Sequence, residues 1–116
     1  MRLLLDECVP RPLKRDLPGH DVHTVVEMGW SSKRNGELLR LMLSDRFEAF
    51  LTVDQNIEFQ QNVKASGVAV IVVVARTNRL REVRPLAPKI LDALNTVKAG
   101  DIIRVGADAT HREGPG

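Results

Sequence analysis

The sequence has few aromatic residues: it contains no tyrosine, one tryptophan and three phenylalanines. Domains that bind RNA by stacking bases on an aromatic sheet surface need several such side chains, so this class is disfavoured. Cys8 is the only cysteine, which excludes an intrachain disulfide and favours a reducing compartment. The longest apolar run, residues 68–75, is too short to span a bilayer, and the N-terminus lacks the apolar core of a signal peptide. These absences predict a cytoplasmic protein without a membrane partner.

Several sequence motifs that are typical of binding or catalytic sites are also absent. The chain has no glycine-rich phosphate loop, no Gly-x-Ser-x-Gly nucleophile motif and no cysteine and histidine set for zinc. The net charge of +2 and the pI near 9.0 are a mild basic bias, weaker than that of an obligate nucleic-acid-binding domain. The 116 residues are enough for one domain, and a hydrophobic content of 43% is enough for a buried core.

The pattern of apolar residues alternates between strand and helix along the chain. Strands are predicted at residues 2–5, 21–26, 49–53, 68–75 and 101–105. Helices are predicted between them, at residues 10–17, 35–46, 56–66 and 86–97, and the segment 76–84 is expected to be a basic loop. The order predicts an α/β fold with a mainly parallel five-stranded sheet and helices on both faces. Residues 1–105 form the domain, and the polar, glycine-rich residues 106–116 are expected to be a disordered tail.

Acidic residues follow two of the predicted strands. Asp6 and Glu7 follow the first strand, and Asp54 follows the third. Glu37 lies in the first turn of the helix that begins near Asn35. Because the carboxyl ends of parallel strands share one edge of the sheet, these acids are expected to converge if their strands are neighbours.

Converging carboxylates repel one another and favour a hard divalent cation such as Mg²⁺ or Mn²⁺. A cation of this kind suits hydrolysis of a phosphodiester bond. The phospho-accepting receiver domain is an alternative, since it also has acids after its first and third strands. That alternative expects a hydroxyl residue after the fourth strand and a lysine after the fifth, where this chain has Ala75-Arg76 and Arg104-Val105.

A family resemblance rests on five motifs that follow one another along the chain. In order, these are LLLDECVPRPL, GHDVHTVVEMGW, NGELL, FLTVDQNIEFQQN and a helix that opens with Pro-Leu-x-Pro. Over residues 1–105 the chain resembles a family of small prokaryotic PIN-like proteins. The resemblance implies a PIN-like three-layer α/β/α sandwich. It also implies a Mg²⁺- or Mn²⁺-dependent endoribonuclease of the VapC type, the toxin of a toxin–antitoxin pair. RNA is then the substrate, an antitoxin protein is the partner, and a homodimer is possible.

The resemblance assigns the acids residue by residue. Asp6, Glu37 and Asp54 are the expected catalytic residues and metal ligands, and Glu7 and Glu58 are secondary candidates. Many relatives carry a second aspartate where this chain has Asn56, whose carbonyl oxygen can ligate a metal but brings no charge. A catalytically weakened module that binds RNA or protein is therefore the alternative function.

Basic residues near these acids are expected to hold RNA phosphates. They are Lys33, Arg34 and Arg40 around Glu37, and Arg76 and Arg79 after the fourth strand. Trp30 is expected to pack rather than to stack on a base.

Overall fold

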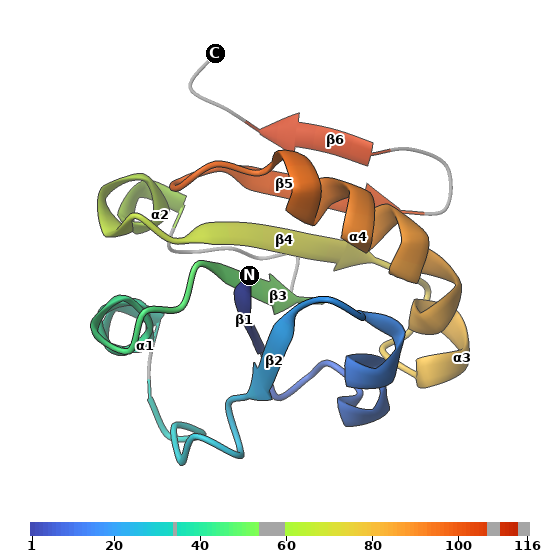
Figure 1. Cartoon of the computed structure of the whole chain (residues 1–116), viewed down its shortest axis with the longest axis horizontal. Helices are drawn as coiled ribbons and strands as arrows, with labels where there is room; N and C mark the ends of the chain where they lie inside the picture. The colour runs from blue at the N-terminus through green and yellow to red at the C-terminus, as the bar shows by residue number, and fades with distance from the viewer. Residues whose placement is uncertain (34, 54–59, 107–109, 114–116) are drawn as a thin grey trace.

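The computed structural model describes residues 1–33, 35–53, 60–106 and 110–113 (Figure 1). Its strands are β1 (Arg2–Leu5), β2 (Asp21–Thr24), β3 (Ala49–Thr52), β4 (Ala69–Val74), β5 (Ile102–Gly106) and β6 (Thr110–Glu113). Its α-helices are α1 (Asn35–Ser44), α2 (Gln60–Ser66), α3 (Leu80–Val83) and α4 (Ala87–Thr96). Two short 3₁₀ helices are η1 (Arg11–Asp16) and η2 (Arg84–Leu86).

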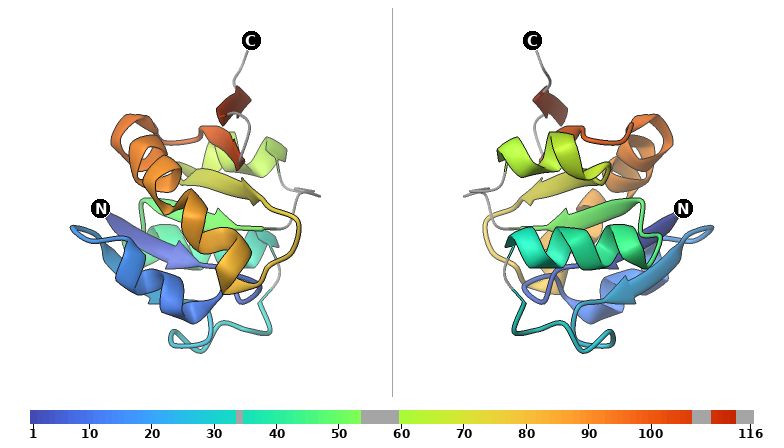
Figure 2. Two further views of the ribbon diagram at one scale, coloured as in Figure 1. Left: turned by 90° about the vertical axis from the view of Figure 1, so that its right-hand side faces the viewer. Right: turned by 90° about the vertical axis from the view of Figure 1, so that its left-hand side faces the viewer.

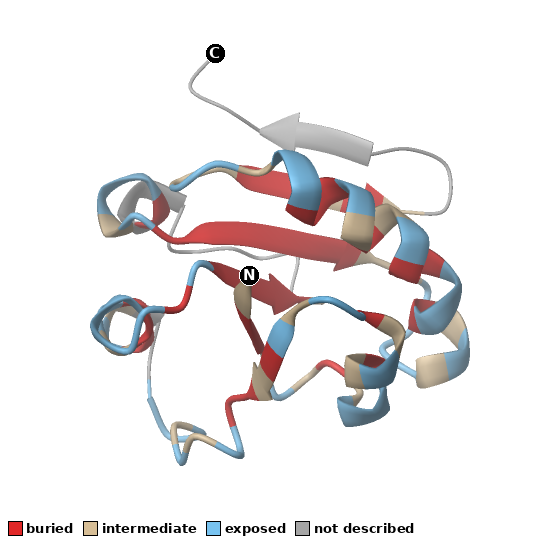
Figure 3. Cartoon of the chain, in the orientation of Figure 1, coloured by how far each residue is buried: buried red, intermediate tan, exposed pale blue. Residues whose placement is uncertain are grey.

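The six strands form one sheet in the order β2-β1-β3-β4-β5-β6. Strands β1 to β5 are parallel, which confirms the prediction of a five-stranded parallel arrangement. The inner strands β3 and β4 are buried along almost their whole length (Figure 3). Their continuous apolar and β-branched sequences are typical of strands that helices cover on both faces.

The C-terminal segment corrects one expectation. Residues Thr110–Glu113 form β6, which pairs antiparallel with β5, whereas the composition predicts disorder throughout 106–116. The physical reason is that an edge strand leaves backbone donors and acceptors open, and even a polar segment satisfies them by pairing. Residue 106 ends β5, and residues 107–109 and 114–116 lie outside the described part of the chain.

Helices cover both faces of the sheet, so the chain is a three-layer α/β/α structure (Figure 2). Alternate residues of β1 separate the two cores: Leu4 packs with α1 and α2, whereas Leu3 and Leu5 pack with η1, α3 and α4. None of the described helices is long and apolar enough to cross a bilayer.

The segment expected to be a basic loop is partly helical. Arg79 directly precedes α3 in an extended conformation, and the helix continues into η2, where Pro85 occupies the first turn. Val83 is fully buried in the core, and this burial fixes a helix too short for periodicity to reveal. Arg76 and Arg79 stay in the connection between β4 and α3.

Candidate functional site

The site is built where β1 and β3 end. These strands are neighbours, with Leu5 opposite Leu51, as their predicted convergence requires. The backbone N–H of Asp6 donates a hydrogen bond of 2.9 Å to the carbonyl of Leu51, so the pairing continues one residue past β1. Asp6 is therefore fixed at the carboxyl edge of the sheet, the edge at which open α/β sheets bind ligands.

Neighbouring groups orient the carboxylate of Asp6. The Thr52 hydroxyl donates a hydrogen bond of 2.8 Å to Oδ2, and the Cys8 thiol donates to the same oxygen at 3.4 Å. The backbone N–H of Glu7 donates to Oδ1 at 2.9 Å. Thr52 is only 1% exposed while Asp6 is half-buried, so the donor is hidden and the acceptor remains accessible. This arrangement fixes a carboxylate in one orientation at the surface.

The alternation of side chains along β3 shows on which face of the sheet the Asp6 carboxylate lies. Phe50, two residues before Thr52 in β3, packs on the side of α1 and α2, and side chains alternate along a strand. Thr52 therefore lies on this same face, and the carboxylate of Asp6 meets it there. Glu37 lies in the first turn of α1, which begins at the edge toward which the strand arrows point (Figure 2).

Glu37 thus lies at the same edge of the sheet as Asp6, on the face that α1 covers, and no hydrogen bond or ion pair joins these two described residues. Glu37 is exposed and makes no hydrogen bond or ion pair with any other residue that the structure describes. Its position in the first turn of α1 complements the helix dipole. Asp54, Asn56 and Glu58 lie outside the described residues.

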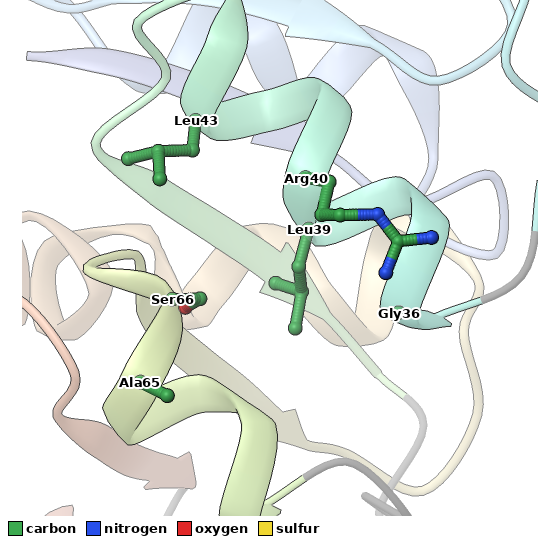
Figure 4. Close-up of a pocket in the computed structure, with 6 residues that line it drawn as sticks. All are labelled: Gly36, Leu39, Arg40, Leu43, Ala65 and Ser66. Atoms are coloured by element: carbon green, nitrogen blue, oxygen red, sulfur yellow. The ribbon is translucent and has the colours of Figure 1, made fainter.

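The predicted basic residues are spread over separate surfaces. Arg76 and Arg79 are exposed in the connection after β4, at the same edge as Asp6. Arg40 instead lines a groove of about 290 Å³ between α1 and α2 (Figure 4). Lys33 is exposed in the loop before α1, and Arg34 lies outside the described residues. Unlike Arg40, Arg76 and Arg79 therefore share the edge of Asp6 through the connection that follows β4.

A second cavity, of about 320 Å³, opens beside Asp6. Its lining includes Asp6, Glu7, Cys8, Arg11, Val26 and Asn78. The side-chain amide of Asn78 donates a hydrogen bond of 3.1 Å to the carbonyl of Cys8. This contact joins the connection after β4 to the segment after β1 and closes one side of the cavity.

The sequence did not predict the roles of Thr52, Arg11 and Asn78. A signal for Thr52 exists, because it is the one hydroxyl residue in the otherwise apolar stretch 49–53. No pattern near Asn78 or Arg11 indicates that both line one cavity, because their position relative to each other depends on the strand order.

Cys8 and Trp30 have local structural roles. Burial raises the pKa of the Cys8 thiol, a hydrogen bond from the Val53 backbone partly offsets this, and the charge of Asp6 raises the pKa further. The thiol is therefore poorly suited to act as a nucleophile. Trp30 packs edge-on against Phe47 with ring centroids 5.8 Å apart, which agrees with its expected packing role.

The described part of the chain contains no group of three or more histidine, cysteine, aspartate or glutamate side chains arranged to hold a metal ion. That part does not include Asp54. No family model, no curated protein and no solved structure matches the chain. The resemblance to PIN-like proteins therefore stays a prediction from the motifs.

Proposed function

We propose that the chain is a PIN-like, metal-dependent endoribonuclease, the toxin of a toxin–antitoxin pair. One observation supports it above the others: a buried threonine at the end of β3 orients the carboxylate of Asp6 at the end of β1. Asp54 follows two residues after that threonine in the sequence. A fixed, half-exposed carboxylate at the edge shared by two strands is suited to bind a cation.

The donor set has the chemistry of a hard-cation site. Asp6, Glu37 and Asp54, with the carbonyl oxygen of Asn56, would hold Mg²⁺ or Mn²⁺ through oxygen atoms alone. The bound cation would lower the pKa of an attacking water and neutralise charge at the phosphate. The chain's own contribution is orientation, because Thr52 and the Glu7 backbone hold Asp6 before any ligand arrives.

The basic residues supply the second half of the proposal. Arg76 and Arg79 lie exposed at the same edge, where they would contact RNA phosphates and position the strand over the acids. The partner of this toxin would be an antitoxin protein, and a homodimer remains part of the proposal.

Calorimetric titration with Mn²⁺ tests the metal site directly. Wild type is expected to bind the ion, whereas Asp6→Asn and Asp54→Asn should each weaken binding by at least about tenfold. Asp92→Asn is the matched control, because Asp92 is an exposed acid on α4. Cleavage of a fluorescent single-stranded RNA, measured in parallel, should fall in the first two variants and remain unchanged in the third.

Three outcomes would overturn the proposal. They are the absence of Mn²⁺ binding by wild type, cleavage that Asp54→Asn leaves unchanged, and an acid-labile adduct on Asp54 after treatment with acetyl phosphate. Binding of RNA without metal or cleavage would identify the weakened binding module instead.

A further inference from the structure

Two large apolar side chains are exposed in the described part of the chain. Val26 is 62% exposed and Leu43 is 53% exposed. Leu43 lines the groove between α1 and α2 (Figure 4), whereas Val26 lines the cavity beside Asp6. A single exposed apolar residue is ordinary on a protein surface, so Val26 is of interest only because it lines a cavity together with polar and charged side chains.

The cavity beside Asp6 combines apolar and polar groups from three connections. Asp6 and Arg11 follow β1, Val26 follows β2, and Asn78 follows β4. Its volume of about 320 Å³ falls at the lower end of the range for small-molecule sites. The cavity is therefore large enough for one nucleotide unit but not for a folded partner.

Two polar groups of this cavity are available to a ligand. Arg11 is exposed, makes no hydrogen bond or ion pair with another residue in the described ranges, and interacts with the Glu27 carboxylate only through its charge. Asn78 donates one amide hydrogen to Cys8, which leaves its Oδ1 and its second N–H available. A guanidinium recognises a phosphate, and an amide with one donor and one acceptor recognises the edge of a base.

We infer that this cavity is a nucleotide subsite, which takes one base and its adjoining phosphate from the RNA strand. The inference rests on the proposed function and names the part of the substrate that binds beside the acids. The base packs against Val26 with its edge toward Asn78, and the phosphate lies toward Arg11.

The charges favour a nucleotide over a free anion. The carboxylates of Asp6 and Glu7 also line the cavity, so phosphate alone would be repelled by two negative groups. A nucleotide carries the same negative phosphate, but contact of its uncharged base with the apolar side chain of Val26 offsets this repulsion. Its phosphate remains at the side where Arg11 lies.

The groove between α1 and α2 provides the comparison. Leu39, Leu43 and Ala65 give it an apolar lining, with Arg40 at its side (Figure 4). No carboxylate or amide side chain is among its described lining residues. It therefore shares the exposed apolar residue and the arginine but lacks the set of groups that recognises a base.

Titration of ¹⁵N-labelled protein with AMP, GMP, CMP, UMP or inorganic phosphate, without added metal, tests the subsite. At least one nucleotide should shift the amide resonances of residues 6–9, 11, 24–26 and 76–79, while inorganic phosphate at the same concentration should leave them in place. Val26→Asp should weaken this binding by at least about tenfold, because it replaces the apolar wall with a charge. Leu43→Asp, which places the same charge in the other groove, should leave it unchanged.

Arg11→Gln tests the phosphate contact separately. In this variant the nucleotide should bind no more tightly than the corresponding nucleoside, while the resonance shifts near Val26 persist. The inference is overturned if phosphate alone causes the same shifts. It is also overturned if no nucleotide shifts these resonances, or if Val26→Asp binds as wild type does.

Metal-free binding separates this inference from the proposed nuclease. RNA cleavage without nucleotide binding in the cavity would overturn the subsite alone. Nucleotide binding in a protein that never cleaves RNA would overturn the nuclease alone.

Discussion

The hydroxyl of Thr52 donates a hydrogen bond of 2.8 Å to Oδ2 of Asp6, although the two residues are 46 positions apart in the chain. The bond joins the ends of two neighbouring parallel strands at the edge where the acidic residues are expected. It places a buried donor behind a half-exposed acceptor, as in metal sites where an outer residue orients a ligand.

Thr52→Val removes this donor with little change in side-chain size. We expect Mn²⁺ affinity to fall by about tenfold, because the carboxylate loses the shortest of the three hydrogen bonds that orient it. The free energy of unfolding should fall by about 1 kcal/mol, a typical value for one lost hydrogen bond. Calorimetry and urea unfolding measure the two effects. Thr52→Ser keeps the hydroxyl and should retain most of the metal affinity, and equal losses in both variants would contradict an orienting role.

The salt dependence of RNA binding tests which basic residues contact the substrate. Arg76→Gln and Arg79→Gln should each reduce the slope of log affinity against log salt by about 0.7, the value for one phosphate contact on a single strand. Arg40→Gln should have less effect, because Arg40 lines the groove between α1 and α2. Fluorescence anisotropy at several salt concentrations, on uncleaved RNA without metal, gives the slopes. A larger reduction of the slope in Arg40→Gln would instead place the RNA strand on the α1 side.

Local sequence predicted the fold where burial dominates. The stretch 68–75 is continuously apolar and β-branched, and it forms the inner strand β4. Local sequence was insufficient where tertiary pairing decides the structure. Residues 110–113 are polar and become a strand only because β5 offers an open edge, and α3 is helical because its Val83 is buried.

The candidate site was predicted to a similar extent. Because side chains at the carboxyl ends of parallel strands share one edge, the position of Asp6 followed from the strand pattern. Contacts that join distant segments did not follow from it. Asn78 reaches Cys8 only because the connection after β4 passes the end of β1, and strand order is not contained in any local pattern.

The ion pair between Arg2 and Asp21 predicts how stability depends on pH. The hydrogen bond from Arg2, 2.9 Å long, lowers the pKa of Asp21 below its ordinary value of 3.8. A lowered pKa means that the folded state favours the charged carboxylate. The resulting stabilisation is complete above the unfolded pKa and is lost as the pH falls through the folded pKa.

Urea unfolding of wild type and Asp21→Asn across this pH range measures that contribution. Wild type should be the more stable protein at about pH 5, and the difference should shrink once the pH falls below about 4. Asp92→Asn, on α4, is the control and should show no such convergence. A difference that stays constant down to about pH 2 would contradict a contribution from the charged form.

Gly100 and Gly19 separate two costs of adding a methyl group. Both have a positive φ, +86° and +83°, at which a side chain costs about 1 kcal/mol. A Cβ on Gly19 would meet nothing within 4 Å, whereas one on Gly100 would lie 3.3 Å from the Cα and carbonyl oxygen of Lys64. Because those atoms belong to the backbone, they cannot move aside as a flexible side chain would.

Gly19→Ala should therefore lower the free energy of unfolding by about 1 kcal/mol, the cost of the backbone conformation alone. Gly100→Ala should lower it by at least about 1 kcal/mol more, because the turn before β5 packs directly against the end of α2. Urea unfolding of the two variants in parallel measures the difference. Equal losses would show that this turn moves away from α2 at no cost, and the close packing of these two segments would then contribute nothing to stability.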